Sequence, residues 1–399
     1  LSMFDVGLSM LSYMANIYFA TGESPSAQGS AHPTIYPYNA FETRDGYIVV
    51  APFTNAFWRK YCNVLGREDL ATDEKFKSFS ARLANRKQLA EIINPLMSTR
   101  TTAEWSLALD RGDVPNGPVA SVKEALEHEH TRARGLITSF DHPLCGEVTT
   151  VGSPFKIQYS DGINFEPTYT PPPTVGQHSE VILKNVLGYS DDKIFSLKQS
   201  DVIRVSDTPA GQEPATDVRC EQEGAFDTSS DKPLSGLKVL DLTRMLAGPF
   251  GTLILADLGA DVIKVEEPRL GDPTRHNLPK VGEESAYFMS VNRGKRSVRL
   301  DLKTDQGKEK FFGLLEGADI VIENFRPGVM ERLGLGASKL HKLNNRLIIC
   351  SISGFGQTGP LRDKISFDLV NQAMAGTMSI TGEKGRPPVR IGLPAGDLA

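Results

Sequence analysis

The chain has 399 residues, enough for roughly two or three domains with a sizeable core. Its hydrophobic content of 40%, charged content of 23% and net charge of −5 are ordinary for a globular protein and argue against a nucleic-acid binder, which would carry a broad basic surface. Four cysteines without a CxxC pair argue against a disulfide framework or a zinc site. No apolar run reaches the roughly 18 residues that cross a bilayer, so we expect no membrane partner.

The first half of the chain mixes helical and strand patterns. Residues 3–20 predict one helix, because apolar residues recur near helical spacing. A signal sequence is disfavoured there, since the stretch lacks a basic start and contains Asp5. The further elements expected in chain order are a hairpin around 44–46, helices over 54–109, a turn-rich connection at 114–119, a helix at 122–130, strands within 138–160 and a helix over 179–188.

A stretch of different composition follows. Residues 204–233 are rich in Pro, Ser, Thr, Asp and Glu, contain one aromatic residue and show almost no apolar periodicity. Such a composition predicts a solvated linker. We therefore divide the chain into residues 1–203, the linker 204–233 and residues 234–399, with a smaller α+β domain over about 35–120 and a return to the larger domain over 121–203.

Strands and helices alternate in the second half. Strand patterns cover residues 237–242, 261–268, 295–302, 318–325 and 347–356. Helical patterns of about ten residues separate most of them, including one that begins after the N-cap Thr304. This alternation predicts an α/β fold with a doubly wound parallel sheet.

Ligands of such sheets bind beyond the carboxyl ends of the strands. The segments expected there are Thr243–Pro249, Glu266–Arg275, Asn324–Gly328 and Ser353–Pro360. Basic residues of the same half would suit a phosphorylated ligand, although a solvated surface is the simpler interpretation of any single one; they are Lys295, Arg296, Lys303, Arg326 and Arg332. The GxGxxG, GxxxxGK[ST], GxSxG and HExxH patterns are absent, which disfavours dinucleotide, P-loop, serine-hydrolase and metal sites.

A single carboxylate, Asp397, stands in the last segment, PPVRIGLPAGDLA. An Asp that follows Gly is commonly the N-cap of a helix. Because the other nucleophile patterns are missing, a carboxylate acting as nucleophile or base is the chemistry that remains, and Asp397 is the best-placed carboxylate for it. From the residues alone, both interpretations of Asp397 stay open.

Long motifs of the second half resemble, in order, the N-terminal half of family III CoA-transferases, the CaiB/BaiF group. These motifs are LSGLKVLDLTRMLAGPFGTLILADLGADVIKVEEPRLGDPTR, NRGKRSVRLDLKTDQGK, IVIENFRPGVMERLGLG, IICSISGFGQTGP and RIGLPAGDLA. Residues 1–203 resemble the C-terminal half of the same family through GSAHPTIYPYNAFETRDGYIVVA, ARLANRKQL, VPNGPV and VGQHSEVILKNVLGYSDDKI. The resemblance implies a Rossmann-like large domain, a smaller α+β domain and an interlocked homodimer or an intramolecular pairing of tandem units.

The two halves occur in the reverse of the family's order. The simplest explanation is a window from a tandem fusion, in which the end of one copy, a linker and the start of the next copy follow one another. A functional circular permutant is disfavoured, because the segment that joins the two halves in the family is missing. The chain is nearest in appearance to formyl-CoA and succinate–hydroxymethylglutarate CoA-transferases.

The resemblance also implies roles for individual residues. Asp397 corresponds to the family's catalytic aspartate. Positions that line the CoA nucleotide site correspond to Leu300, Lys303, Asn324, Phe325, Arg326 and Arg332, while Ala247 and Ile365 correspond to positions near the pantetheine path.

Two departures from the family pattern qualify these roles, and one further motif separates the chain from the racemase branch. Glu267 stands where an arginine often helps to hold the CoA nucleotide. The motif Ser366-Phe367-Asp368 lacks the histidine that acyl-CoA racemases of this fold need as a second base. A short GSAHP stretch replaces the glycine-rich run of formyl-CoA transferase, which favours the carnitine or dicarboxylate branches.

The implied activity is transfer of CoA between an acyl-CoA and a free carboxylic acid through an aspartyl-CoA thioester, with CoA as a substrate and no permanently bound cofactor or metal. Alternatives are a CoA-transferase/lyase of the DMSP type, a racemase of the same fold, or a non-catalytic fragment that binds a partner. The expected partners are a small acyl-CoA and an acid, and the donor and acceptor acids stay open. The expected compartment is the cytoplasm, with the mitochondrial matrix as the alternative, since reduced cysteines fit both.

Overall fold

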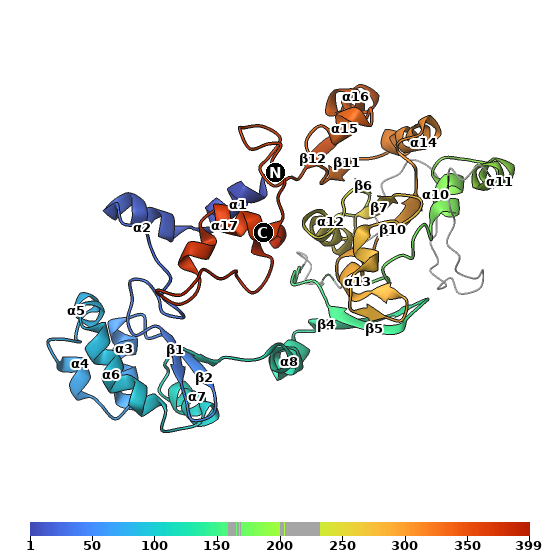
Figure 1. Cartoon of the computed structure of the whole chain (residues 1–399). Coiled ribbons are helices and arrows are strands. Elements are labelled where there is room, and N and C mark those ends of the chain that lie inside the picture. Colours follow the sequence, from blue (N-terminus) through green and yellow to red (C-terminus); the bar gives the residue numbers. More distant parts are fainter. Residues whose placement is uncertain (159–164, 166, 168, 200–202, 204–231) are drawn as a thin grey trace. The chain divides into compact units, whose positions relative to one another are not determined.

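The computed structural model describes residues 1–158, 165, 167, 169–199, 203 and 232–399 (Figure 1). The chain forms two compact units. Unit 1 consists of Leu1–Ser9, Glu129–Ala375 and Gly392–Ala399, and unit 2 consists of Met10–His128 and Gly376–Ile391. Of the predicted linker, only Lys232 and Pro233 belong to the described residues.

A five-stranded parallel sheet is the centre of unit 1 (Figure 1). Its strands are β6 (Lys238–Asp241), β7 (Asp261–Glu266), β10 (Arg296–Arg299), β11 (Ile320–Glu323) and β12 (Ile348–Ser351). Their spatial order is β10-β7-β6-β11-β12, and every neighbouring pair is parallel. The predicted α/β fold with a parallel sheet is therefore confirmed, and the chain reverses its direction of travel across the sheet between β6 and β11.

Helices and short hairpins complete unit 1. The helices are α1 (Met3–Met10), α9 (Glu129–Ala133), α10 (Ser179–Asn185), α11 (Asp191–Gln199), α12 (Ala247–Asp257), the 3₁₀ helix η1 (Pro273–His276), α13 (Ala286–Asn292), α14 (Asp305–Glu316), α15 (Val329–Arg332), α16 (Ala337–Leu343), α17 (Asp368–Met374) and α18 (Ala395–Leu398). The two antiparallel hairpins are β4 (Ile137–His142) with β5 (Gly146–Val151), and β8 (Lys280–Val281) with β9 (Glu284–Ser285).

The two faces of the sheet bury different helices, because successive residues of a strand point to opposite faces. Leu240, Ile263 and Val321 pack into a core with residues of α10, α11, α14 and α16. Val239 and Ile322 belong to a second core, to which the carboxyl-terminal part of α12 contributes. Helices thus cover both faces, which is the doubly wound arrangement that the alternating pattern predicts.

Unit 2 contains a three-stranded antiparallel sheet with the order β1-β2-β3. Its elements are α2 (Tyr13–Thr21), β1 (Asn39–Glu42), β2 (Tyr47–Val50), α3 (Asn55–Val64), α4 (Asp69–Thr72), α5 (Phe79–Ala84), α6 (Arg86–Met97), α7 (Thr102–Arg111), β3 (Asn116–Pro118), α8 (Val122–Glu127) and the 3₁₀ helix η2 (Thr377–Ile380). Its core centres on aromatic residues such as Trp58, Tyr61 and Trp105. The predicted hairpin is present as β1 and β2.

Three local predictions were wrong in detail. The single helix expected over 3–20 is divided into α1 and α2, because Ser12 has a positive φ of 47°, which is not helical and which no periodicity reveals. The helix expected over 122–130 ends at Glu127, since His128 is extended. The connection at 114–119 contains β3, which pairs with β2.

Helix α17 has two chemically different faces. Asp368, Asn371 and Gln372 are buried, whereas Phe367, just before the helix, and Leu369 are 64% and 50% exposed.

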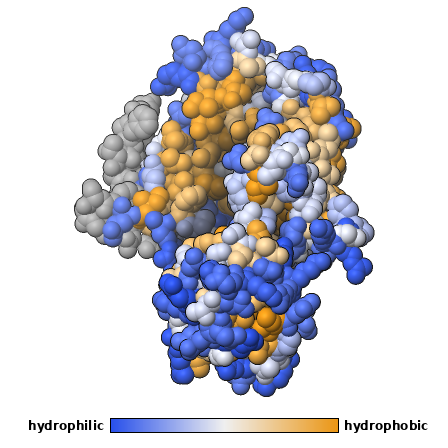
Figure 2. All heavy atoms as spheres, turned by 90° about the vertical axis from the view of Figure 1, so that its left-hand side faces the viewer, coloured by the Kyte–Doolittle hydropathy of each residue, from blue (hydrophilic) through white to orange (hydrophobic). Residues whose placement is uncertain are grey.

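Hydrophobic side chains gather in patches between larger hydrophilic areas on the face of the molecule in Figure 2. None of the helices in the described part of the chain has both the length and the apolar character needed to cross a bilayer.

Candidate active site

Two cavities open in unit 1 at the carboxyl edge of the parallel sheet. One, of about 350 Å³, has Asp397 in its wall and is called the Asp397 cavity. The other, of about 240 Å³, has Lys303 in its wall and is called the Lys303 cavity. Arg244 and Phe325 border both. These cavities lie next to the point where the strand order reverses, which is where open α/β sheets bind their ligands.

The loops after the strands supply most of both walls. The Asp397 cavity is lined by Met3, Arg244, Met245, Leu246, Ala247, Pro273, Asn324, Phe325, Arg326, Pro327, Ile352, Ser353, Gly354, Arg362, Lys364, Ile365, Ser366, Phe367 and Asp397. The Lys303 cavity is lined by Leu242, Thr243, Arg244, Lys264, Val265, Glu266, Glu267, Gly271, Asp272, Leu300, Asp301, Leu302, Lys303, Phe325, Val329 and Leu333.

The structure brings most of the predicted site residues together. Those that line the Asp397 cavity are Ala247, Asn324, Phe325, Arg326, Ile365 and Asp397. Leu300 and Lys303 line the Lys303 cavity. Arg332 is not among the residues that line either one. The roles of all nine residues stay predictions.

Arg244 and Phe325 form the boundary between the cavities, and Asn324 holds the backbone of Arg244. The Arg244 guanidinium carbon lies 4.8 Å from the centre of the Phe325 ring, within the range of a cation–π contact. The Asn324 side chain accepts a hydrogen bond from Arg244 N at 2.8 Å and donates one to Arg244 O at 2.6 Å. These contacts connect the loop after β6 to the loop after β11.

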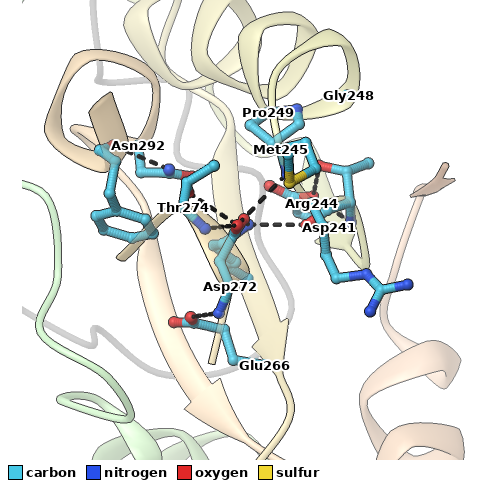
Figure 3. Close-up of polar contacts among 12 residues, drawn as sticks. Asp241, Arg244, Met245, Gly248, Pro249, Glu266, Asp272, Thr274 and Asn292 are labelled. Atoms are coloured by element: carbon cyan, nitrogen blue, oxygen red, sulfur yellow. Dashed lines mark hydrogen bonds and ion pairs between the residues drawn. The ribbon is translucent and has the colours of Figure 1, made fainter. Parts of the chain in front are cut away.

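A buried network of charged residues supports the loop that carries Arg244 (Figure 3). At the end of β6, Asp241 accepts hydrogen bonds from Thr243 N at 2.8 Å and from Lys295 Nζ at 3.1 Å. Lys264 Nζ donates to Thr243 O at 2.8 Å and forms an ion pair with Asp272 at 3.0 Å. Burial alone would raise the pKa of Asp241, but the nearby lysine ammonium groups hold it well below its usual range. Asp241 therefore stays ionised at neutral pH.

The supported loop is strained. Met245 has φ of 69°, a left-handed conformation that is uncommon for a residue with a side chain and that costs on the order of 1–2 kcal/mol. Gly248 is required at the start of α12, because a Cβ atom there would lie 2.4 Å from Cβ of Thr243. A strained loop that a buried network holds in place is typical of a ligand-binding or catalytic segment.

Asp397 is partly buried. It lies in α18, whose N-cap position is Pro394, so Asp397 is not the N-cap residue. Burial, together with the nearby Asp368 carboxylate, raises the pKa of Asp397 to about 6. Burial raises the pKa of the Tyr287 phenol on α13, and the charge of Asp397 raises it further. Asp397 is therefore a carboxylate in the wall of a cavity, held in an environment that makes its negative charge costly.

Three residues that stand at possible ligand-binding positions in the sequence are instead bound to other parts of the protein. Lys295 is fully buried and binds Asp241, Asn292 Oδ1 and Pro249 O. Arg296 forms an ion pair with Asp261. Glu267 accepts hydrogen bonds from the backbone of the turn that follows it. The expectation that Lys295 faces a phosphorylated ligand is therefore wrong, and Arg296 already has a carboxylate partner.

Sequence reasoning missed several cavity residues. Arg244 lies inside the predicted segment Thr243–Pro249, but nothing in the motif distinguishes it from a surface arginine. Arg362 and Lys364 line the Asp397 cavity although they follow the predicted segment Ser353–Pro360. Only the close packing of α17 and α18 reveals the proximity of Asp368 to Asp397. Among the residues that the structure describes, no group of three or more His, Cys, Asp or Glu could hold a metal ion.

Comparison with known proteins places the chain in one family. Residues 1–179 and 234–399 match the family described as CoA-transferase family III. The acetyl-CoA:oxalate CoA-transferase of Acetobacter aceti is 52% identical over 160 residues, 40% of this chain and 41% of that protein. The succinyl-CoA:glutarate CoA-transferase of Mus musculus is 47% identical over 174 residues, 43% of this chain and 40% of that protein.

The chain is also similar to part of a solved structure. The crystal structure of a CAIB/BAIF family protein from Brucella suis is 46% identical and covers 42% of this chain and 46% of that chain, with a TM-score of 0.41. The present chain therefore spans less than half the length of each of these three relatives.

Proposed function

The chain belongs to CoA-transferase family III, and on that premise we propose that it transfers CoA between an acyl-CoA and a free carboxylic acid, with Asp397 as the nucleophile. The observation that carries the proposal is the position of Asp397: it lies in the wall of a cavity at the carboxyl edge of the sheet. With a pKa of about 6, its carboxyl group is largely ionised at neutral pH and is yet less stabilised than an exposed carboxylate.

The proposed reaction proceeds in two matched halves. A carboxylate oxygen of Asp397 attacks the carbonyl carbon of the donor thioester, the C–S bond breaks, and CoA leaves as a thiolate, which gives a mixed anhydride. The thiolate then attacks the Asp397 carbonyl carbon, and the donor acid leaves as a carboxylate, which gives an aspartyl-CoA thioester. The acceptor carboxylate repeats these steps in reverse. The covalent relay conserves the thioester bond while it exchanges the acid.

The two cavities suit the two ends of an acyl-CoA. We assign the nucleotide to the Lys303 cavity, where the apolar side chains of Leu300 and Phe325 lie beside the exposed ammonium group of Lys303. The pantetheine arm and the thioester then occupy the Asp397 cavity, whose wall contains Ala247 and Ile365. Arg244 borders both cavities and so can contact the phosphates between them.

The acid substrates are proposed from the relatives. Those named above act, by name, on oxalate and on glutarate with acetyl-CoA and succinyl-CoA as donors. Dicarboxylic acids are therefore the first acceptors to test. Racemisation is not favoured, because Phe367 in the same cavity wall has no group that can move a proton.

The test is an exchange assay on this chain. Succinyl-CoA or acetyl-CoA is incubated with glutarate or oxalate, and new acyl-CoA is measured by mass spectrometry. A sample quenched with hydroxylamine during turnover is digested to locate a hydroxamate. We expect exchange and a hydroxamate at Asp397, both absent in Asp397→Asn and Asp397→Ala variants that still bind CoA. Exchange that persists in both variants would show that Asp397 is not the nucleophile.

A further inference from the structure

Two side chains of α17 hold the turn that leads into Asp397. Asp368 Oδ1 accepts a hydrogen bond from Gly396 N at 2.9 Å, and Asp368 Oδ2 accepts one from Gln372 Nε2 at 2.7 Å. Gln372 Nε2 also lies 3.4 Å from Leu393 O, to which it donates. Both ends of the turn Leu393–Gly396 are therefore attached to one turn of α17, and Asp397 is the next residue.

The attachment is buried and close. Asp368 is 8% exposed and Gln372 is 2% exposed. A Cβ atom on Gly396 would lie 3.2 Å from Asp368 Oδ1, so the glycine permits the short approach of the carboxylate to the backbone. Because Gly396 directly precedes Asp397, a shift of its amide would redirect the Asp397 side chain.

The charge of Asp368 is unexpected for a purely structural contact. Among the described residues, Asp368 has no ion-pair partner, although its oxygens accept two hydrogen bonds. A buried carboxylate without a cation is costly, and a neutral amide could accept the same hydrogen bond from Gly396 N. The charge itself therefore calls for an explanation.

We propose that Asp368 is a positioning residue for the reaction: it fixes the direction of Asp397 through the Gly396 amide, and its negative charge favours the step in which Asp397 becomes acylated. This inference depends on the proposed function. When the Asp397 oxygen bonds to the donor carbonyl carbon and the C–S bond breaks, the negative charge passes to the CoA thiolate. The repulsion between Asp368 and Asp397 then disappears, since the anhydride is neutral.

The other groups near Asp397 are few. On α13, burial raises the pKa of the Tyr287 phenol, and the charges of Asp397, Asp272 and Asp368 raise it further. The first part of α12, Ala247–Thr252, carries no titratable side chain. The cations that line the same cavity are Arg244, Arg326, Arg362 and Lys364. Burial and Asp368 determine the raised pKa of Asp397, so removal of the Asp368 charge should change it.

The test compares two substitutions of Asp368 by steady-state kinetics across pH. Asp368→Asn keeps an oxygen acceptor for Gly396 N and removes the charge. We expect kcat to fall about 10-fold with KM for acyl-CoA nearly unchanged, because the lost interaction acts on the acylation step. The acidic limb of kcat/KM should move to lower pH by about half a unit, because the like charge is gone. Asp368→Ala also loses the hydrogen bond and should reduce kcat about 100-fold.

Controls separate the possible outcomes. Asp305→Asn, at a fully exposed carboxylate, should leave both kcat and the pH profile unchanged. A wild-type kcat and an unmoved acidic limb in Asp368→Asn would overturn this inference while the proposed function stands, provided that wild type shows exchange and the Asp397 hydroxamate. A wild-type chain that shows neither would overturn both.

A third variant tests the proposal in case both Asp368 variants do not fold. If both Asp368 variants lose their circular dichroism signal, Gln372→Leu removes the support of Asp368 Oδ2 and of Leu393 O but keeps the charge. A reduced kcat with an unmoved acidic limb would support positioning through α17. An unchanged kcat would contradict it.

Discussion

The side chain of Asn324 is hydrogen-bonded to both backbone polar groups of Arg244, with Arg244 N to Oδ1 at 2.8 Å and Nδ2 to Arg244 O at 2.6 Å. The two residues are 80 positions apart in the chain and follow different strands, β6 and β11. Their pairing crosses the point where the strand order reverses. It therefore holds together the loops after β6 and β11, which both line the Asp397 cavity.

Asn324→Ala should loosen this junction. The Arg244 backbone loses two partners, and the strained Met245 loses the support of its neighbour, so we expect the free energy of unfolding to fall by about 1–3 kcal/mol and kcat/KM by about 10-fold. Urea denaturation and exchange kinetics measure the two effects. Asn345→Ala, at an exposed asparagine, is the control. Equal values for both variants would show that the pairing does not support the site.

Arg244→Met should weaken CoA binding. Methionine keeps much of the apolar length over Phe325 but removes the charge, and Arg244 forms no ion pair among the described residues. We expect KM for acyl-CoA to rise about 10-fold with kcat changed less than about 3-fold, and binding to become less sensitive to salt. Arg346→Met, at an exposed arginine, should match wild type. An unaltered KM would exclude a phosphate contact at Arg244.

The exchange reaction should depend on pH through Asp397. Burial raises its pKa to about 6, so the reactive carboxylate form is lost as pH falls through 6. We therefore expect kcat/KM to be level above about pH 7 and to decrease about tenfold per pH unit below about pH 5. The profile is measured between pH 4.5 and 8.5, with circular dichroism at each pH to confirm folding. An acidic limb centred near pH 4 would contradict the raised pKa.

Asp397→Asn should stabilise the chain at neutral pH. A carboxyl group whose pKa is higher in the folded state than in the unfolded state stabilises the protein at low pH, and that contribution is lost as pH rises from about 4 to 6. The ionised group therefore destabilises the fold at pH 7, by about 1–2 kcal/mol after allowance for partial exposure. Thermal unfolding at pH 7.5 should show a higher midpoint for the variant, and the difference should vanish near pH 4. A lower midpoint at pH 7.5 would contradict this prediction.

Arg275→Met should be strongly destabilising. Arg275 forms two hydrogen bonds with Glu266 at 2.9 and 2.8 Å, and both side chains are at most 4% exposed. Burial alone would raise the pKa of Glu266, but Arg275, together with Lys264 and Ser297, lowers it to about 2. Removing the cation leaves a buried charge uncompensated, so we expect a loss of about 3–5 kcal/mol in urea denaturation. Glu74→Ala, in an exposed ion pair with Lys77, should leave the midpoint unchanged.

The sequence by itself determined the type of fold, because its signals are local. Apolar strands separated by helices of about ten residues require a parallel sheet with helices on both faces, and all five strands were predicted. The N-cap Thr304 was also predicted, because threonine is a preferred N-cap residue. In the structure its side chain accepts a hydrogen bond from Gly307 N, three residues later. The family motifs pointed to Asp397, which no local pattern distinguished from a helix cap.

Only the tertiary structure decided which charges serve the site. Lys295, at the start of a predicted strand, was expected to suit a ligand, yet it is buried against Asp241, whereas Arg244, which no motif distinguished, borders both cavities. Likewise, Asp368 meets the turn before Asp397 through contacts between segments 28 residues apart. Side-chain periodicity describes a face of one element, whereas the packing of several elements determines the partner, burial and pKa of each charge.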